Sequence, residues 1–223
     1  MPAPPAAAAL FGSRLPLAAR YADLLAGPGV VRGLIGPAEA GRIWDRHLLN
    51  CAAVAELVPA AASIVDLGSG AGLPGLVLAL MLPDSAVTLL EPMARRASFL
   101  AECVSQLGLT NASVLRARAE DEAGQLGADV VTARAVAPLD RLAVLAAGLA
   151  RPGGLVLAIK GDSAADELRA ARPVLRRLGV RNASVVRAGS DRVGAVATVV
   201  RFTIAGTRGE AGSQRGAGSR RTG

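Results

Sequence analysis

Aromatic residues, cysteine, histidine and lysine are all scarce in this chain of 223 residues. Aromatic side chains make up 2% of the sequence, which argues against a surface where RNA bases stack on rings. Cys51 and Cys103 lie far apart and form no metal-binding pattern, as expected in a reducing compartment. No apolar run reaches the roughly 20 residues that cross a bilayer, because Pro83 and Asp84 interrupt the best candidate. We therefore expect a cytoplasmic protein without a membrane segment or a metal site.

The charges that are present are mostly positive, and the net charge is +7. Lys160 is the single lysine, so arginine carries the excess. Guanidinium groups bind phosphate through paired hydrogen bonds and stack on bases, which favours nucleic acid as a partner. A coding bias toward arginine would explain the ratio of arginine to lysine, but not the excess of positive charge. The hydrophobic content of 52% predicts a folded chain.

Composition divides the chain into three parts. Residues 1–14 are rich in Ala and Pro and predict a loose, low-complexity N-terminus. Residues 15–204 form the predicted domain, with a helical cap over residues 15–58 and a core over residues 63–204. Residues 205–223 are rich in Gly, Ser and Arg and predict a disordered basic tail.

Short apolar runs alternate with helical patterns in the predicted core. Uninterrupted apolar strands are typical of a parallel sheet that helices cover on both faces, so the pattern predicts an α/β fold. Residues 106–117 and 177–188 are nearly identical in sequence, and each segment predicts the end of a helix, a glycine in the left-handed conformation and then a strand. The last two strands follow each other without a helix, which predicts a hairpin and an antiparallel final strand. The strands are predicted at 63–67, 86–90, 113–116, 129–133, 155–159, 184–186 and 196–204, and the helices at 74–82, 94–107, 139–150 and 166–178.

The stretch "VDLGSGAGLPG" joins the first predicted strand to a helix. Gly70, Gly72 and Gly75 match the G-x-G-x-x-G spacing of dinucleotide-binding loops, which is weak evidence by itself. A pyrophosphate needs free N–H groups at the start of the helix, and Pro74 removes one of them. Asp66 at the end of the strand instead favours a cationic ligand held against the backbone of the loop. A dinucleotide and a methyl donor both remain open at this point.

Further polar residues are expected at the same edge of the sheet, where the later strands end. Glu91 follows the second strand, and a carboxylate there can accept both hydroxyls of an adenosine ribose. Ala119 and Glu120 follow the third strand and are expected beside an adenine ring. Arg134 ends the fourth strand and Lys160 the fifth, so both are candidates for a reaction pocket.

The residue types at these strand ends also limit the chemistry. Many amino-directed nucleic-acid methyltransferases carry Asp or Asn, two prolines and an aromatic residue where this chain has Arg134. Neither Cys51 nor Cys103 is predicted in a loop at these strand ends, which argues against covalent attack on a pyrimidine. A nucleophile with its own lone pair remains, such as guanine N7, which a cationic side chain could position. His47 and Trp44 lie on the apolar stripe of a predicted helix and are expected in the core.

Six segments, taken in order, resemble one family. They read "IWDRHLLNCA", "VDLGSGAGLPGLVLAL", "LLEPMARRASFL", "RARAED", "VVTARAVAPLDRL" and "GGLVLAIKG". Over residues 11–202 the chain resembles the RsmG (GidB) family of bacterial 16S rRNA guanine-N7 methyltransferases, in its actinobacterial form. The resemblance implies a class I S-adenosylmethionine-dependent methyltransferase with a Rossmann-like sheet of seven mostly parallel strands and an N-terminal helical cap. Asn50 and Cys51 depart from the Asp-Ser pair of many members.

The resemblance also implies a reaction on one guanine of 16S rRNA, in the decoding-region loop of the small ribosomal subunit. The substrate would be the rRNA, an assembly intermediate or the finished subunit. Separately from the resemblance, we expect the enzyme to be a monomer. With Asp66 and Gly70 from the loop, the predicted cofactor contacts are Asp66, Gly68, Gly70, Leu73, Glu91, Ala119, Glu120 and Arg134. The predicted catalytic residues are Arg118, Arg134 and Lys160. Two other classes stay open: a nicotinamide-dependent oxidoreductase, and a non-catalytic RNA-binding assembly factor that binds through its basic tail.

Overall fold

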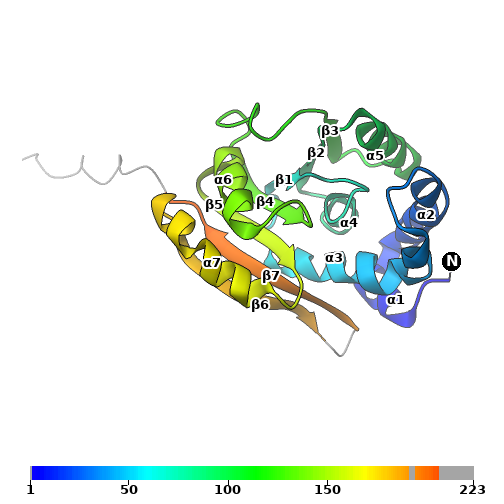
Figure 1. Ribbon diagram of the computed structural model, residues 1–223. Helices are drawn as coiled ribbons and strands as arrows, with labels where there is room; N and C mark the ends of the chain where they lie inside the picture. The colour runs from blue at the N-terminus through cyan, green and yellow to red at the C-terminus, as the bar shows by residue number, and fades with distance from the viewer. Residues whose placement is uncertain (1, 191–193, 206–223) are drawn as a thin grey trace, which may run out of the picture.

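The computed structural model describes residues 2–190 and 194–205, which form a seven-stranded sheet with helices on both faces (Figure 1). The strands are β1 (Ser63–Leu67), β2 (Ala86–Leu90), β3 (Ala112–Leu115), β4 (Ala128–Arg134), β5 (Ala150–Lys160), β6 (Arg181–Ser190) and β7 (Ala195–Thr203). Their order in the sheet is β3-β2-β1-β4-β5-β7-β6. The first five strands pair in parallel, and β7 pairs antiparallel with both β5 and β6. The predicted fold class and the predicted antiparallel final strand are therefore confirmed.

The strand order places the end of β1 at a special point of the sheet. From β1 the chain builds outward to β2 and β3 on one side, and then returns to add β4 and β5 on the other. Asp66 on β1 accordingly lies between Leu89 of β2 and Thr132 of β4. Connections leave in opposite directions here and open a crevice at the carboxyl ends of the strands, where ligands of such sheets bind.

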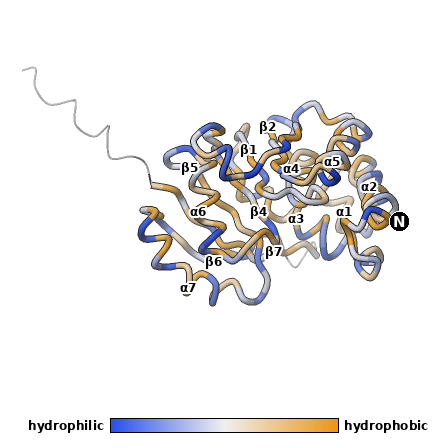
Figure 2. Tube along the Cα trace, turned by 45° about the horizontal axis from the view of Figure 1, so that its top comes forward, coloured by the Kyte–Doolittle hydropathy of each residue, from blue (hydrophilic) through white to orange (hydrophobic). Residues whose placement is uncertain are grey.

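Two layers of helices bury the apolar strands. The helices of the core are α4 (Gly75–Met81), α5 (Ala94–Leu107), α6 (Leu139–Leu149) and α7 (Ala164–Arg177). α4 and α5 cover one face together with the cap, and α6 and α7 pack together on the other (Figure 1). Successive residues of β7 point to opposite faces of the sheet. Val199 packs in the hydrophobic cluster with α4 and α5, and Val200 packs in the cluster with α6 and α7. Hydrophobic residues gather along the central strands, while α7 carries many hydrophilic ones (Figure 2).

The N-terminal cap is helical from its start. It contains α1 (Pro5–Phe11), α2 (Leu15–Leu24), α3 (Leu49–Ala53), 3₁₀ helices at Gly12–Arg14, Pro37–Arg42 and Val54–Leu57, and π-helical turns at Leu25–Gly29 and Ile43–Leu48. The prediction of a loose segment over residues 1–14 is wrong for residues 5–14. Ala7 and Phe11 are buried, and the Phe11 ring meets Trp44 edge-on at 6.3 Å between centroids. Proline costs little in the first turn of a helix, and the apolar side chains after it have a core to fill.

The glycines and prolines of residues 26–37 do not end the second helix of the cap where they begin. The helix continues through a π-helical turn at Leu25–Gly29, in which Leu25 and Gly29 are buried. Pro28 lacks the N–H that an α-helical turn would use, and the wider turn accommodates that loss. The chain leaves the helix only after Val31.

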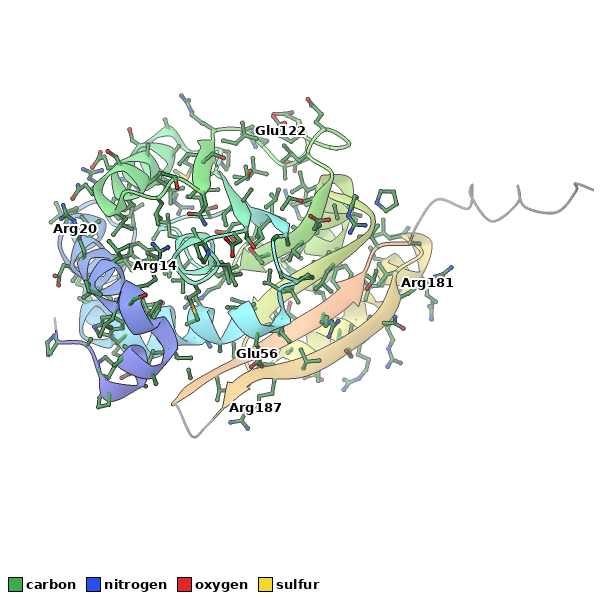
Figure 3. The ribbon with its side chains drawn as sticks, turned by 180° about the vertical axis from the view of Figure 1, so that it is seen from behind. Arg14, Arg20, Glu56, Glu122, Arg181 and Arg187 are labelled. Carbon is green, nitrogen blue, oxygen red and sulfur yellow. The ribbon has the colours of Figure 1, made fainter. Side chains whose placement is uncertain are left out.

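The cap is tied to the β6–β7 hairpin at the far side of the sheet. Glu56, which lies beside the hairpin (Figure 3), accepts a hydrogen bond from the Gly189 N–H at 2.7 Å. Asn50 donates one to the Val196 carbonyl at 2.8 Å. Arg181 and Arg187 project outward from β6 (Figure 3). The tail predicted over residues 205–223 lies, from residue 206 on, outside the described residues. Within the described part of the chain, no helix has the length and apolar character to cross a membrane.

Candidate active site

The loop between β1 and α4 follows a path that only glycine allows at several positions. Gly68, Gly70 and Gly72 have φ of +66°, +58° and +99°, in the left-handed region that other residues rarely adopt. A Cβ atom on Gly72 would lie 2.8 Å from the Tyr21 hydroxyl, and one on Gly75 would lie 2.6 Å from Asp66 Oδ2. Residues 68–75, called the glycine loop below, are therefore packed tightly as well as sharply turned.

Asp66 lies beneath the glycine loop and is fully buried. Its Oδ2 accepts a hydrogen bond from the Gly75 N–H at 3.0 Å, and its Oδ1 accepts one from the Thr132 hydroxyl at 3.0 Å. Burial raises the pKa of this carboxyl to about 6, although its hydrogen bonds oppose the rise. The sequence predicts Asp66 as a ligand of the cofactor. The structure places it where it holds the loop to β4 and to α4, outside the lining of the cavity above.

Two further side chains hold the glycine loop from other directions. Glu91 is almost fully buried, accepting hydrogen bonds from Gly70 N–H at 3.0 Å and Met93 N–H at 2.9 Å. Tyr21 of the cap donates its hydroxyl to the Ala71 carbonyl at 2.8 Å. Burial raises the pKa of this phenol well above its usual value, so Tyr21 stays a neutral donor. The sheet and the cap thus hold the loop in one shape.

The start of α4 does not offer a phosphate site. Pro74 has no N–H, the Gly75 N–H is bonded to Asp66, and the Leu76 N–H is bonded to the Gly72 carbonyl at 2.9 Å. A pyrophosphate at this position would also approach the carboxylate of Asp66. The match of Gly70, Gly72 and Gly75 to the dinucleotide fingerprint therefore has a different cause: Gly72 makes room for Tyr21, Gly75 makes room for Asp66, and Gly70 adopts a left-handed φ.

A cavity of about 240 Å³ lies above the glycine loop, and we call it the loop cavity. Gly68, Gly70 and Leu73 of the loop line it, together with Arg134 at the end of β4, as the sequence predicts. Its other walls are Leu34, Ile35, His47, Ser69, Ala71, Arg96 and Ala135. The loop presents backbone at Gly68 and Gly70, so a ligand can approach the main chain directly.

The residues predicted beside an adenine lie farther along the same edge. The Glu91 N–H donates to the Leu115 carbonyl at 3.1 Å, which brings the segment after β3 next to the segment after β2. Ala119 in that segment is buried, and Glu120 is exposed with its Oε1 4.0 Å from Arg141 Nη2. Neither they nor the exposed Arg118 line the loop cavity. The contact of Ala119 and Glu120 with a cofactor stays a prediction, and so does the catalytic role of Arg118.

Arg134 joins the sheet to the cap. Its Nη2 donates to the Arg46 carbonyl at 3.0 Å and lies 2.7 Å from His47 Nδ1, and its Nη1 lies 3.4 Å from Cys51 Sγ. Burial raises the pKa of the Cys51 thiol to about 11, so the sulfur is a neutral acceptor rather than a nucleophile. Ala135, the next residue, has φ of +54°, a left-handed conformation that costs about 1 kcal/mol for a residue with a side chain.

His47 is a site residue that the sequence did not indicate. Burial and the charge of Arg134 lower its pKa to about 4, so the ring is neutral near pH 7. Its Nδ1 accepts from Arg134, which places the hydrogen on Nε2. That Nε2 lies 3.3 Å from Glu39 Oε2, with no hydrogen bond to any described residue. The sequence could not indicate this role, because a histidine on an apolar helix stripe has the same spacing whether it faces the core or a cavity. Trp44 of the same stripe is in the core, as predicted.

A second cavity of about 580 Å³ lies on the other side of Arg134, and we call it the charged cavity. It shares His47, Arg134 and Ala135 with the loop cavity. Its remaining walls are Glu39, Asp45, Arg46, Asn50, Ile159, Lys160, Gly161 and Glu167. Lys160 is the predicted member of this set. The sequence missed the carboxylates and the amide, because isolated polar residues of the cap and of α7 carry no spacing signal.

Lys160 is held by partners on two elements. Its Nζ donates to the Ala137 carbonyl at 2.9 Å and lies 2.7 Å from Glu167 Oε2. Burial of Glu167 favours a raised pKa, but hydrogen bonds from Lys160, Ser163 and the Leu139 N–H outweigh it and hold the pKa below its usual value. The ammonium and the carboxylate are therefore both charged. Within the described residues, no group of three or more His, Cys, Asp and Glu is placed to hold a metal ion.

The comparisons with known proteins agree on one family. A family model described as "GidB: rRNA small subunit methyltransferase G" matches residues 14–193. The ribosomal RNA small subunit methyltransferase G of Thermobifida fusca is 56% identical over 199 residues, which cover 89% of this chain and 84% of that protein. The protein of the same name from Streptomyces coelicolor is 52% identical over 204 residues, with 91% and 85% covered.

Solved structures show the same fold at low sequence identity. A SAM-dependent methyltransferase from Aquifex aeolicus superposes with a TM-score of 0.56 at 20% identity, covering 79% of this chain and 98% of that one. The tRNA (m1A58) methyltransferase from Aquifex aeolicus gives a TM-score of 0.55 at 15% identity, covering 71% and 69%. The fold is that of the class I methyltransferases. With the matched family model and relatives above half identity, the chain belongs to the rRNA small subunit methyltransferase G family.

Proposed function

We propose that this protein transfers a methyl group from S-adenosylmethionine to N7 of one guanine in the rRNA of the small ribosomal subunit. The observation that carries the proposal is the wall shared by the two cavities, formed by His47, Arg134 and Ala135. One cavity is built from the backbone of the glycine loop, and the other from charged side chains. A methyl donor in the first cavity and a nucleotide in the second would meet where the two cavities adjoin, next to these three residues.

The loop cavity fits the cofactor. Gly68 and Gly70 offer backbone, Leu73 offers an apolar wall, and Arg96 and Arg134 can pair with a carboxylate. Asp66 and Glu91 place negative charge beneath the loop, which favours a cationic ligand over a phosphate. When bound, S-adenosylmethionine supplies an electrophilic methyl group on a positively charged sulfur.

The charged cavity fits a nucleophile that needs no base. Guanine N7 carries a lone pair and no hydrogen, so methyl transfer to it releases no proton. Two groups that could act as a base are engaged: Glu167 is paired with Lys160, and the His47 Nδ1 accepts from Arg134. Arg134 and Lys160 can instead orient the base through O6 or the adjacent phosphates. Their contribution is then the alignment of N7 with the methyl group, which can account for several orders of magnitude in rate.

We further propose that the protein acts as a monomer in the cytoplasm. The two cavities share His47, Arg134 and Ala135, so the cofactor and the guanine can meet within a single copy of the chain. The small subunit or one of its assembly intermediates would supply the guanine.

The test is to incubate small ribosomal subunits that lack the modification with S-adenosylmethionine labelled in its methyl group. The rRNA is then treated with reagents that cleave the chain at N7-methylguanine, and the label and the cut are mapped together. Label at a single cleavable guanine is the expected result. Label that resists this cleavage would place the methyl group on another atom, and no label in rRNA would refute the proposed function.

A further inference from the structure

Three carboxylates line the charged cavity, and two of them already have hydrogen-bond or ion-pair partners within the protein. Glu39 accepts a hydrogen bond from Arg46 at 3.0 Å, and its other oxygen lies 3.3 Å from His47 Nε2. Glu167 is paired with Lys160 and accepts two further hydrogen bonds. Asp45 also lines the cavity and is exposed, but it has no hydrogen bond or ion pair with any described residue.

An unpaired carboxylate is unexpected in a cavity that must admit RNA. Phosphate groups approaching Asp45 are repelled, and this repulsion lowers affinity unless the carboxylate gains a partner in the complex. Neighbouring Arg46 is already paired with Glu39. The donor that compensates Asp45 is therefore expected on the substrate.

The orientation of a guanine in the charged cavity points to that donor. N7 has to face the wall shared with the loop cavity, which His47, Arg134 and Ala135 form. The N1–H and the N2 amino group lie on the opposite edge of the purine, away from N7. Asp45 lines the charged cavity but not the loop cavity, so it is available to the edge of the base that faces away from the shared residues.

We infer that Asp45 selects guanine, by accepting hydrogen bonds from N1–H and from the N2 amino group; this inference rests on the proposed function. Two parallel hydrogen bonds to a carboxylate match the guanine edge and no other base. Adenine presents an acceptor at N1 and no amino group at C2. Paired contacts of this kind discriminate between bases by roughly 10- to 100-fold.

The same contact favours the transition state. Methylation places a positive charge on the purine ring, which makes N1–H a stronger donor. The hydrogen bond to Asp45 is then stronger in the transition state than in the bound substrate, which is the condition for an effect on kcat. Lys160, whose charge would oppose this change, is neutralised by Glu167.

Asp45 also lies in the first turn of the helical segment that begins at Ile43, where a negative charge favours the helix. That structural role would appear in the stability of the protein and would be the same for every RNA substrate. Discrimination between two bases at the target position separates selection from stability.

The experiment uses small-subunit rRNA joined by splint ligation, with either guanine or inosine at the position that the labelling experiment identifies. Inosine keeps N7, O6 and N1–H but lacks the N2 amino group. We expect the wild-type protein to methylate guanine with a kcat/KM about 10-fold or more above that for inosine. In Asp45→Ala the ratio falls to near one, and in Asp45→Asn it falls in the same direction.

Asp84→Asn is the matched control, since Asp84 is an exposed aspartate outside both cavities, and it keeps the wild-type ratio. Calorimetric titration with S-adenosylmethionine and thermal unfolding establish that each variant is folded. A wild-type ratio near one overturns the inference, and so does an Asp45→Ala ratio equal to that of wild type. Absence of any N7-methylguanine with wild-type protein refutes the proposed function instead.

Discussion

The two cavities differ in what builds them. The loop cavity is shaped by backbone, and the side chains around it point at that backbone: Asp66 at Gly75, Glu91 at Gly70, and Tyr21 at the carbonyl of Ala71. The charged cavity is shaped by side chains that hold one another, as in the pairs Lys160–Glu167 and Arg46–Glu39. The shape of the first is therefore part of the fold, whereas the second can change its chemistry while the fold persists. Variants in the two cavities should show this difference.

Gly75→Ala is expected to give the largest effect. The new Cβ would lie 2.6 Å from Asp66 Oδ2 and would also meet Leu89, so the buried carboxylate has to move from its hydrogen bond with the residue 75 N–H. Overpacking and the lost hydrogen bond together should lower the free energy of unfolding by about 2–4 kcal/mol and abolish measurable binding of S-adenosylmethionine. Urea denaturation and calorimetric titration measure the two quantities.

Gly41→Ala is the matched control for that variant. No atom lies within 4 Å of the position that its Cβ would take, and its φ is not in the left-handed region. Its free energy of unfolding should stay within about 0.5 kcal/mol of wild type. Equal stability of the two variants would mean that the glycine loop is not packed as tightly as the structure shows.

Arg134→Ala should separate activity from stability. The side chain contacts Arg46, His47 and Cys51 at the border of the two cavities. Losing a positioned donor commonly lowers kcat by 100-fold or more, and we expect about that loss in methyl transfer. The free energy of unfolding should fall by no more than about 1 kcal/mol. Exposed Arg169, which pairs with Asp166 on the same helix, provides a control, and Arg169→Ala should leave both unchanged. Parallel loss of folded protein and activity in Arg134→Ala would contradict the claim that this part of the site can change while the fold persists.

Asp66 beneath the glycine loop and His47 at the border of the two cavities should make the free energy of unfolding depend on pH in opposite directions. The pKa of Asp66 is about 6 in the folded protein against an ordinary 3.8, so its stabilising proton is lost as the pH rises between these values. The pKa of His47 is about 4 against 6.5, so folding is penalised as the pH falls between these values. Relative to wild type, Asp66→Asn should gain stability as the pH rises from 4 to 6.

His47→Asn should instead gain stability over wild type as the pH falls from 6.5 to 4. Each difference should amount to about 2–3 kcal/mol across its window. Urea denaturation at half-unit steps of pH measures both. The same trend in both variants would mean that one of the two side chains is not buried in its neutral form.

The strands, and the residues at their ends, are the part that the sequence predicts well. A buried parallel strand reads as an apolar run, and its last residue lies at the ligand edge, which is why Gly68, Arg134 and Lys160 are found at the cavities. What a carboxylate at a strand end contacts cannot be read in this way. The contact of Asp66 and Glu91 with a cofactor stays a prediction; the structure adds that both accept hydrogen bonds from loop N–H groups, which depend on the path of the loop above them.

Apart from Glu167 on α7, the cap carries the polar residues of the charged cavity that the sequence did not predict. His47, Glu39 and Asp45 reach the cavities only because the cap packs against one face and one edge of the sheet. That placement rests on contacts between segments far apart in the chain, such as the hydrogen bond between Asn50 and Val196. Periodicity within a helix identifies its buried side but not the element it packs on, so the cap side of both cavities is visible only in the structure.

Tyr21→Phe tests the smallest expected difference, the share of the cap in holding the glycine loop. The variant removes one buried hydrogen bond, to the Ala71 carbonyl, while Asp66 and Glu91 still hold the loop from the sheet. The free energy of unfolding should fall by about 1 kcal/mol, and the Kd for S-adenosylmethionine should rise by less than about tenfold. Arg32→Ala is the control, since it breaks an exposed ion pair between cap and α5 and should change stability by about 0.5 kcal/mol and the Kd not at all. If Tyr21→Phe weakened cofactor binding as strongly as Gly75→Ala, the cap rather than the sheet would determine the shape of the loop cavity.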